Sequence, residues 1–314
     1  MGAVYNMFDA DLGSVIFNAQ TIASIVAAGN SWFVNATNGN DSNPGSSALP
    51  FATLGAAMSA AVANNGDVVY LNGTVHETAT VAWNKNGVSL VAMQSPSMNC
   101  RSRISSTGAT PFSPLVDVTG VGCSFINIGA FHGGFTGATG SQVCWAEAGG
   151  RNFYGGCQFF GGGDATTAAL AGMRSLTIAG SGENLLDGCV IGLDTIVRAT
   201  NPNASLEFLA GTARNVIRRT TFRSYCTDTG DSHILIQSGG MDRELWLDDC
   251  LFHNFGGTAL AAAIINEGGS PGGDVILNAT CLSVGATAIA TTGNVYGPIG
   301  ALGATTWGIA GLLT

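Results

Sequence analysis

Three aspartates and two arginines recur at matched positions along the chain, and their types and spacing could do chemistry. Asp187, Arg218 and Asp248 stand about thirty residues apart, and Arg219 and Asp249 directly follow the last two. Such carboxylates could hold Ca²⁺ while an arginine takes a proton α to a carboxylate. An alternating stack of the same charges would instead form a structural ladder, because opposite charges on neighbouring strands attract. The ladder is the simpler interpretation, and catalysis by Asp187, Arg218, Asp248 and Asp249 is the alternative.

The elements that must position these residues are the units of a repeat of about thirty residues. One small residue per unit marks the repeat, at Cys157, Cys189, Thr220, Cys250 and Thr280, with Cys123 about one unit earlier. Each unit consists of strand-like segments and Gly-rich or Ser-rich turns, without helical periodicity between units. Such units can stack as coils of a parallel β-helix, where equivalent positions form columns about 4.8 Å apart.

Two apolar columns accompany this small-residue position. The first lies four residues before it, at Phe153, Leu185, Val216, Trp246 and Ile276. The second lies two residues after it, at Phe159, Ile191, Phe222, Phe252 and Leu282. We expect both columns to line a continuous interior, with Cys and Thr in the narrow space beside them.

Composition and charge limit the class of protein. Charged residues make up only 10% of the 314 residues, and a chain of this length can form one elongated solenoid domain. The formal net charge of −9 argues against nucleic acid and anionic membranes as partners. The apolar stretch from Val15 to Gly29 lacks the basic segment of a signal peptide, and no stretch is long and apolar enough to span a bilayer.

Metal and cofactor motifs are weak. The four histidines show no zinc-ligand spacing, no Cys-x-x-Cys occurs, and the cysteines are expected to be reduced and buried. Asp228 and Asp231 could contribute to a Ca²⁺ site, although a turn is the simpler interpretation of this segment. We therefore expect no cofactor.

A run of short motifs lies between Trp32 and Glu77. It comprises Gly39-x-Asp41-x-x-x-Gly45, Pro50-Phe51-Ala52-Thr53-Leu54, Gly66-Asp67-Val68-Val69-Tyr70-Leu71 and the turn from Gly73 to Glu77. This run resembles the opening of pectate-lyase-like right-handed β-helix proteins. The resemblance implies an all-β fold, a right-handed single-stranded parallel β-helix with an N-terminal capping helix and apolar terminal extensions. It implies a fold alone, because that superfamily includes lyases, hydrolases, adhesins and virus structural proteins.

The expected organisation has three parts. Residues 1–30 form an N-terminal arm, residues 31–283 form the β-helix with a cap helix at about 51–63, and residues 284–314 form an uncharged C-terminal assembly tail. Leu54, Met58 and Val62 stand at helical spacing, so the cap helix can cover the first coil.

The resemblance would imply, for polygalacturonase-like members, three carboxylates on one face followed by a His-Gly segment and a segment with arginine and lysine. These catalytic elements are incomplete in this chain. Thr227-Asp228 and Asp248-Asp249 follow the order of the first two carboxylate elements. The His132-Gly133 pair precedes them, however, and Arg243 is the last basic residue of the chain. The downstream arginine or lysine that would hold an acidic sugar is therefore missing.

The C-terminal tail is the strongest indication of assembly. No charged residue occurs from Val275 to Thr314. An open coil end and an apolar tail invite association, so we expect the tail to be buried against another chain or the last coil. The expected assembly residues are Trp307, Ile309, Leu312 and Leu313.

Two functional hypotheses follow. The leading one is a non-enzymatic bacteriophage virion protein, a capsid decoration or cement protein or a tail-associated β-helix, that is a homotrimer and has capsid or tail proteins as partners. Its location would be the virion, after synthesis in the host cytoplasm. The alternative is a polysaccharide-binding or polysaccharide-degrading tailspike or lyase-like enzyme that acts on host surface polysaccharide, with Trp145, Tyr154 and Trp246 as the aromatic residues of its groove.

Overall fold

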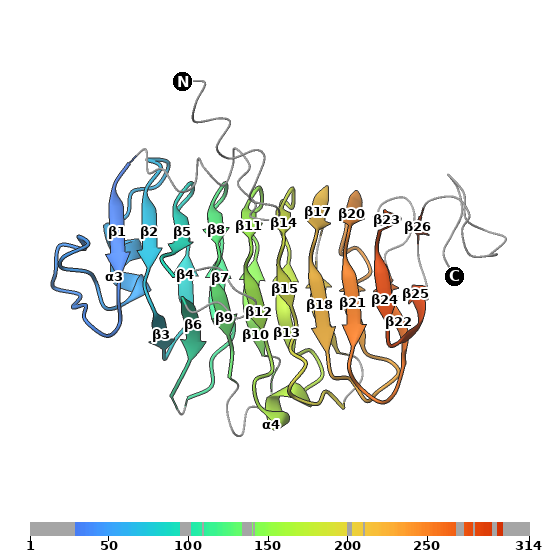
Figure 1. The fold of residues 1–314 in the computed structure, drawn as a ribbon. Helices are drawn as coiled ribbons and strands as arrows, with labels where there is room; N and C mark the ends of the chain where they lie inside the picture. Colours follow the sequence, from blue (N-terminus) through green and yellow to red (C-terminus); the bar gives the residue numbers. More distant parts are fainter. Residues whose placement is uncertain are drawn as a thin grey trace, which may run out of the picture.

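The protein is a rod built from three long parallel sheets (Figure 1). The computed structural model describes residues 29–94, 102–108, 110–133, 140, 142–199, 203–209, 211–267, 273–278, 280–290 and 294–297. Within these residues the chain passes, from β2 onward, from sheet A to sheet B to sheet C and back to sheet A, and every strand pairs in parallel with a strand of a neighbouring coil. The predicted right-handed parallel β-helix is confirmed.

The three sheets contain the following strands of the described residues. Sheet A contains β1 (Ser31–Val34), β2 (Val68–Leu71), β5 (Ser89–Ala92), β8 (Ser124–Ile126), β11 (Phe153–Gly155), β14 (Leu185–Asp187), β17 (Asn215–Arg218), β20 (Glu244–Asp248), β23 (Asp274–Leu277) and β26 (Val295–Tyr296). Sheet B contains β3 (Thr74–Glu77), β6 (Arg103–Ser106), β9 (Gly129–Phe131), β12 (Gln158–Phe160), β15 (Val190–Ile191), β18 (Thr221–Ser224), β21 (Leu251–Asn254) and β24 (Leu282–Val284). Sheet C contains β4 (Val81–Trp83), β7 (Val116–Val118), β10 (Val143–Glu147), β13 (Arg174–Ile178), β16 (Ala204–Phe208), β19 (Ser232–Ile236), β22 (Leu260–Asn266) and β25 (Ala286–Ala290).

The predicted column of small residues is confirmed through the middle of the rod. The residues directly after Cys157, Cys189, Thr220 and Cys250 are register partners on successive coils, and all four column residues are buried. The column differs from the prediction at both ends. Gln158 pairs with Gly129 and Leu251 pairs with Leu282, so the equivalent positions are Ile128 and Cys281 rather than Cys123 and Thr280.

One of the two expected interior columns is correct. Phe159, Ile191, Phe222 and Phe252 are buried, and the rings of Phe222 and Phe252 stack with centroids 4.8 Å apart. Leu282 is instead 57% exposed, because the shift at Cys281 places Ser283 opposite Phe252.

The other expected interior column faces outward. In sheet A the interior positions belong to the next residue of each strand, namely Tyr154, Leu186, Ile217, Leu247 and Leu277, all of which are buried. Successive side chains of a strand point to opposite faces, so Phe153, Leu185, Val216, Trp246 and Ile276 form an outer column. The prediction was wrong by one residue for this column, which places Trp246 on the surface.

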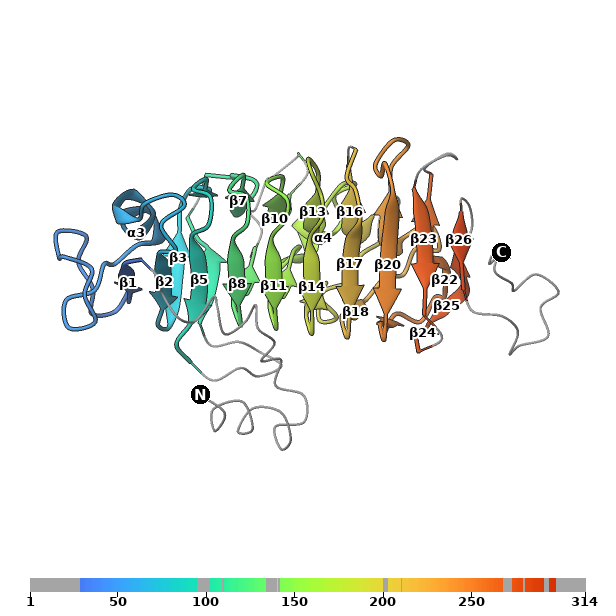
Figure 2. The same cartoon turned by 90° about the horizontal axis from the view of Figure 1, so that it is seen from above.

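A short helix, α3 (Leu54–Ala60), lies at the N-terminal end of the rod (Figure 2). The Thr53 hydroxyl caps it by accepting from the Ala56 N–H, and Asp41 accepts hydrogen bonds from the Ala52 and Thr53 N–H groups. Leu54 and Met58 are buried, whereas Val62 lies beyond the helix and is exposed. The helix therefore lies where a cap was expected but is shorter than residues 51–63.

Asp67 ties the turn after this helix to the first coil. Its buried carboxylate accepts hydrogen bonds from the Trp32 indole at 3.0 Å, the Val62 N–H at 2.9 Å and the Asn30 N–H at 2.8 Å. Burial alone would raise the pKa of Asp67, but these bonds outweigh it and lower the pKa to about 2. The Gly-Asp motif thus has a structural role.

The β-helix continues beyond its expected end. Strands β25 and β26 pair with β22 and β23, so the coils reach Tyr296 rather than stopping near residue 283. Residues 1–28, which make up nearly all of the expected N-terminal arm, lie outside the described residues. The expected assembly residues Trp307, Ile309, Leu312 and Leu313 lie outside them as well. A helix of membrane-spanning length and apolarity is not found in the described part of the chain.

A second short helix, α4 (Ala165–Ala168), lies in the loop between sheets B and C. Its N-cap is Asp164, which accepts from the Thr166 and Thr167 N–H groups. From β8 to β22 the connections between sheets B and C are longer than the corners between sheets A and B.

Candidate functional site

Sheet A places the charged residues of the repeat side by side at its boundary with sheet B. Asp187 pairs with Arg218 and Arg218 pairs with Asp248 on consecutive strands β14, β17 and β20. Arg219 and Asp249 follow at the corner with φ values of 51° and 50°, a left-handed conformation that turns the chain sharply into sheet B. The register predicted from the thirty-residue spacing therefore holds in the folded chain.

Both arginines bind one carboxylate. Arg218 donates from Nε to Asp187 Oδ2 at 2.8 Å, and Arg219 donates from Nε to Oδ1 at 2.8 Å and from Nη2 to Oδ2 at 2.5 Å. The Asp187 side chain is fully buried, whereas those of Arg218 and Arg219 are 34% and 46% exposed. The hydrogen bond to Asp187 raises the pKa of Arg219.

Asp248 and Asp249 are not part of this clamp. Asp248 accepts from the Asn278 side-chain amide at 2.5 Å, and the Asp249 N–H donates to Thr280 Oγ1 at 3.1 Å. Among the described residues no ion pair joins either aspartate to Arg218 or Arg219. The charge ladder is therefore shorter than the sequence pattern suggested, and it ends at the arginines.

This arrangement leaves the Asp187 carboxylate little scope for acid–base chemistry. A general base must reach the proton that it abstracts, but the Asp187 carboxylate is enclosed and already accepts from two guanidinium groups. The clamp instead neutralises a buried carboxylate and ties coil to coil. The structure thus shows Asp187 enclosed between two arginines of the neighbouring coil.

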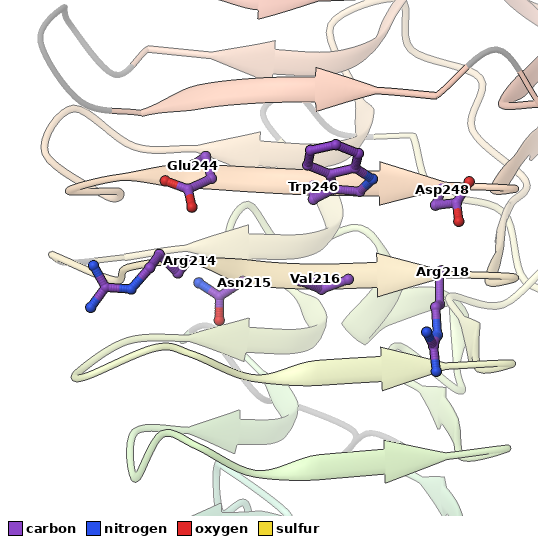
Figure 3. Close-up of a pocket in the computed structure, with 7 residues that line it drawn as sticks. All are labelled: Arg214, Asn215, Val216, Arg218, Glu244, Trp246 and Asp248. Atoms are coloured by element: carbon purple, nitrogen blue, oxygen red, sulfur yellow. The ribbon is translucent and has the colours of Figure 1, made fainter. Parts of the chain in front are cut away.

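A shallow groove lies on the outer face of sheet A, next to this corner. It has a volume of about 380 Å³ and lies over β17 and β20 (Figure 3). Trp246 is 45% exposed at its centre, beside Val216 of the neighbouring strand. The lining residues are Arg214, Asn215, Val216, Arg218, Glu244, Trp246 and Asp248.

The other two aromatic residues expected in a groove are interior residues. Trp145 and Tyr154 are buried and meet edge to face, with ring centroids 5.9 Å apart. The Tyr154 hydroxyl donates to the buried carboxylate of Glu147, which also accepts from Asn152 Nδ2 at 2.9 Å. Burial raises the pKa of Glu147. This network holds the interior of its coil and does not reach a surface groove.

Asp228 and Asp231, the candidates for a metal site, have different environments. Asp228 accepts from the Gly230 N–H at 2.9 Å, which is the turn expected for this segment. Asp231 is fully buried near Arg198, and neither of its carboxylate oxygens accepts a hydrogen bond from the described residues. Burial raises the pKa of Asp231 to about 6. A cluster of three or more His, Cys, Asp or Glu side chains that could hold a metal is not present in the described part of the chain.

Sequence reasoning missed two polar features. Asn152, Asn184 and Asn215 form a ladder in which each side-chain oxygen accepts the backbone N–H of the preceding coil, at distances from 2.7 to 3.2 Å. Asparagine opens three of the repeat segments, and that recurrence could have revealed the ladder. Arg174 and Glu207 form a buried ion pair at 2.9 Å on sheet C, for which the repeat contains no comparable signal.

Searches for related proteins give a likeness of fold only. No family model and no curated protein matches the chain. Among solved structures, the pectate lyase Pel9A is similar at 16% identity, covering 87% of this chain and 79% of that chain with a TM-score of 0.49. The pectin methylesterase from Aspergillus niger has 15% identity, coverages of 85% and 84%, and a TM-score of 0.46. A rhamnogalacturonan lyase has 17% identity, coverages of 89% and 65%, and a TM-score of 0.39. Likeness at this level carries no argument about activity.

Proposed function

We propose that this protein is a non-enzymatic structural β-helix of a bacteriophage virion, a capsid decoration or cement protein or a tail-associated component. The observation that carries the proposal is the enclosed Asp187 carboxylate, held by Arg218 and Arg219. Three of the residues whose spacing first suggested catalysis, Asp187, Arg218 and Arg219, connect neighbouring coils. The sequence resemblance is compatible with this role, because its superfamily includes virus structural proteins.

Self-association is part of the proposal. The last coils expose Leu282 and Val284 on β24, and the chain carries no charge from Val275 to Thr314. Exposed apolar surface at the uncharged end of a rod favours burial against a second copy. We propose a homotrimer, in which Trp307, Ile309, Leu312 and Leu313 contribute to the contacts between chains.

The assembly test compares the full chain with a variant lacking residues 298–314. This end point retains β25 and β26, so the coils remain complete. Light scattering should give a trimer mass for the full chain and a smaller mass for the truncated chain, with unchanged far-ultraviolet circular dichroism. A full chain that stays monomeric at high concentration would contradict the proposal.

The virion location has its own test. The full chain, produced together with the remaining genes of its source genome, should co-purify with particles through a density gradient and be detected in them by mass spectrometry. Its absence from purified particles would refute the location and leave the assembly result standing.

The alternative function is polysaccharide binding, and the groove around Trp246 is the observation that favours it. A half-exposed indole in a hollow flanked by two carboxylates suits the apolar face and the hydroxyl groups of a sugar. The two carboxylates of the groove, Glu244 and Asp248, lie four residues apart on one strand, about 13 Å, which is wider than the separation of about 5 to 9.5 Å between the paired carboxylates that cleave glycosidic bonds. A binding role therefore fits the groove better than a catalytic role does.

A further inference from the structure

We propose that the groove over β17 and β20 binds an uncharged polysaccharide rather than a polyuronate. The inference rests on the polysaccharide-binding alternative and deepens it by naming the class of ligand. Its basis is the position of one aromatic ring and the partners of the charged groups around it.

The first step concerns the shape of the groove. Glu244, Trp246 and Asp248 are alternate residues of one strand and point to the same outer face, as Figure 3 shows. At about 3.3 Å per residue, these three side chains span about 13 Å along the strand. The exposed ring thus lies at the centre of an open strip, long enough for a short oligosaccharide, with a carboxylate on either side.

The second step concerns the arginines, which bind protein carboxylates beside the groove. Arg218 binds the buried Asp187, and Arg214 donates from Nη2 to Glu183 at 2.6 Å. Figure 3 shows both arginine side chains directed away from the Trp246 ring. The Nε and Nη2 groups of both arginines are therefore directed at protein carboxylates, which leaves Glu244 and Asp248 as the charged groups on the strand that carries the ring.

The third step concerns the groups that face the ligand. Glu244 and Asp248 are acceptors that can receive hydrogen bonds from sugar hydroxyls. A polyuronate chain on this strip would bring its own carboxylates close to Glu244 and Asp248, and like charges at such distances repel. An uncharged glycan gains the stacking and the hydrogen bonds without that repulsion.

The test uses the full chain and measures retardation in native gels that contain dextran, mannan, a β-glucan or polygalacturonate. At least one of the three uncharged polymers should retard the wild-type protein, and polygalacturonate should not. Trp246→Ala should weaken the affinity obtained from the retardation by about tenfold. This is the effect expected for the loss of one stacked aromatic contact together with its buried area. Phe255→Ala is the matched control, because Phe255 is similarly exposed (48%) but lies outside the groove, and it should leave retardation unchanged.

A second substitution tests whether the carboxylates of the groove repel a polyuronate. Glu244→Lys should create affinity for polygalacturonate, since it replaces a repelling carboxylate with a cation. Circular dichroism and light scattering on each variant verify that fold and assembly are intact.

Preference of the wild type for polygalacturonate would overturn the inference, as would equal losses in Trp246→Ala and Phe255→Ala. Failure to bind any of the four polymers would also overturn it, while the structural proposal, which is tested by mass and by presence in particles, would stand. Cleavage of a bound uncharged polymer would refute the non-enzymatic role and leave the class of ligand intact.

Discussion

Replacing Asp187 with asparagine should destabilise the protein far more than the same change at Asp248. Asp187 is fully buried and is held by charge-assisted hydrogen bonds from Arg218 and Arg219, at 2.5 to 2.8 Å. Asp187→Asn would keep the shape but remove the negative charge and place an amide N–H₂ group against two guanidinium groups. Asp248→Asn changes a carboxylate that contacts Asn278 at an exposed position.

The size of the expected loss of stability follows from the burial of the Asp187 carboxylate. Removing one partner of a fully buried ion pair costs about 3 to 5 kcal/mol, because the remaining charge stays unpaired out of water. Arg218 and Arg219 are 34% and 46% exposed, so both can turn partly into solvent, and the expected loss is about 2 to 3 kcal/mol. For Asp248→Asn we expect a loss of at most about 1 kcal/mol, as for exposed pairs.

The assay is urea unfolding of both variants, followed by circular dichroism, at low salt and in 1 M NaCl. Salt screens exposed pairs strongly and enclosed pairs weakly, so the cost of Asp187→Asn should persist at high salt. Equal losses for the two variants would refute the argument that burial gives Asp187 its structural role. A loss at Asp187 that disappears in salt would refute it as well.

Three further predictions concern single residues. Asp231→Asn should stabilise the protein by about 2 to 3 kcal/mol at pH 7 and by little at pH 4, because burial raises the pKa of Asp231 from 3.8 to about 6. The protonated Asp231 contributes its stability below pH 3.8, and that stability is lost as the pH rises through 6. Urea midpoints across this range measure the difference between the two proteins, and a pH-independent difference would disprove the prediction. Asp67→Asn should have the opposite dependence, since the lowered pKa of Asp67, about 2, gives stability above pH 3.8 that is lost as pH falls toward 2, and thermal unfolding should show the two proteins converging in acid. Phe222→Ala should lower the free energy of unfolding in urea by about 3 to 5 kcal/mol and Phe255→Ala by less than about 0.5 kcal/mol, because of these two residues only Phe222 lies in the interior. Similar losses for the two variants would show that the interior column is wrongly placed.

The repeat predicts the fold, but it does not predict which face each strand residue occupies. Recurring small residues located the coils, and strand pairing confirms their alignment from Cys157 to Cys250. In β14, by contrast, Leu185 and Leu186 are both apolar, so hydrophobicity does not tell the inner side chain from the outer one. A single-residue error in this choice assigns Trp246 to the interior, although it is the most exposed aromatic side chain of its sheet.

The charged corner was predictable in register but not in its contacts. Thirty-residue spacing placed Arg218 between Asp187 and Asp248, as strand pairing does. Arg219 shares its left-handed conformation with Gly156 and Gly188 at the same position of the repeat, so the repeat marks the corner. It does not mark the partner of the side chain, which turns back to Asp187. The partner of each charge therefore depends on backbone geometry that the sequence reasoning did not contain.

The measurement that tests the central claim most directly is chain-length analysis of polysaccharides after prolonged incubation with the full chain. Dextran, mannan, a β-glucan and polygalacturonate would be examined by mass spectrometry and by counting new reducing ends. A structural protein whose Asp187 is enclosed by Arg218 and Arg219 should leave all four polymers at their original length. Shortening of any polymer that is abolished in a folded Asp248→Asn variant would contradict the account and establish an enzyme.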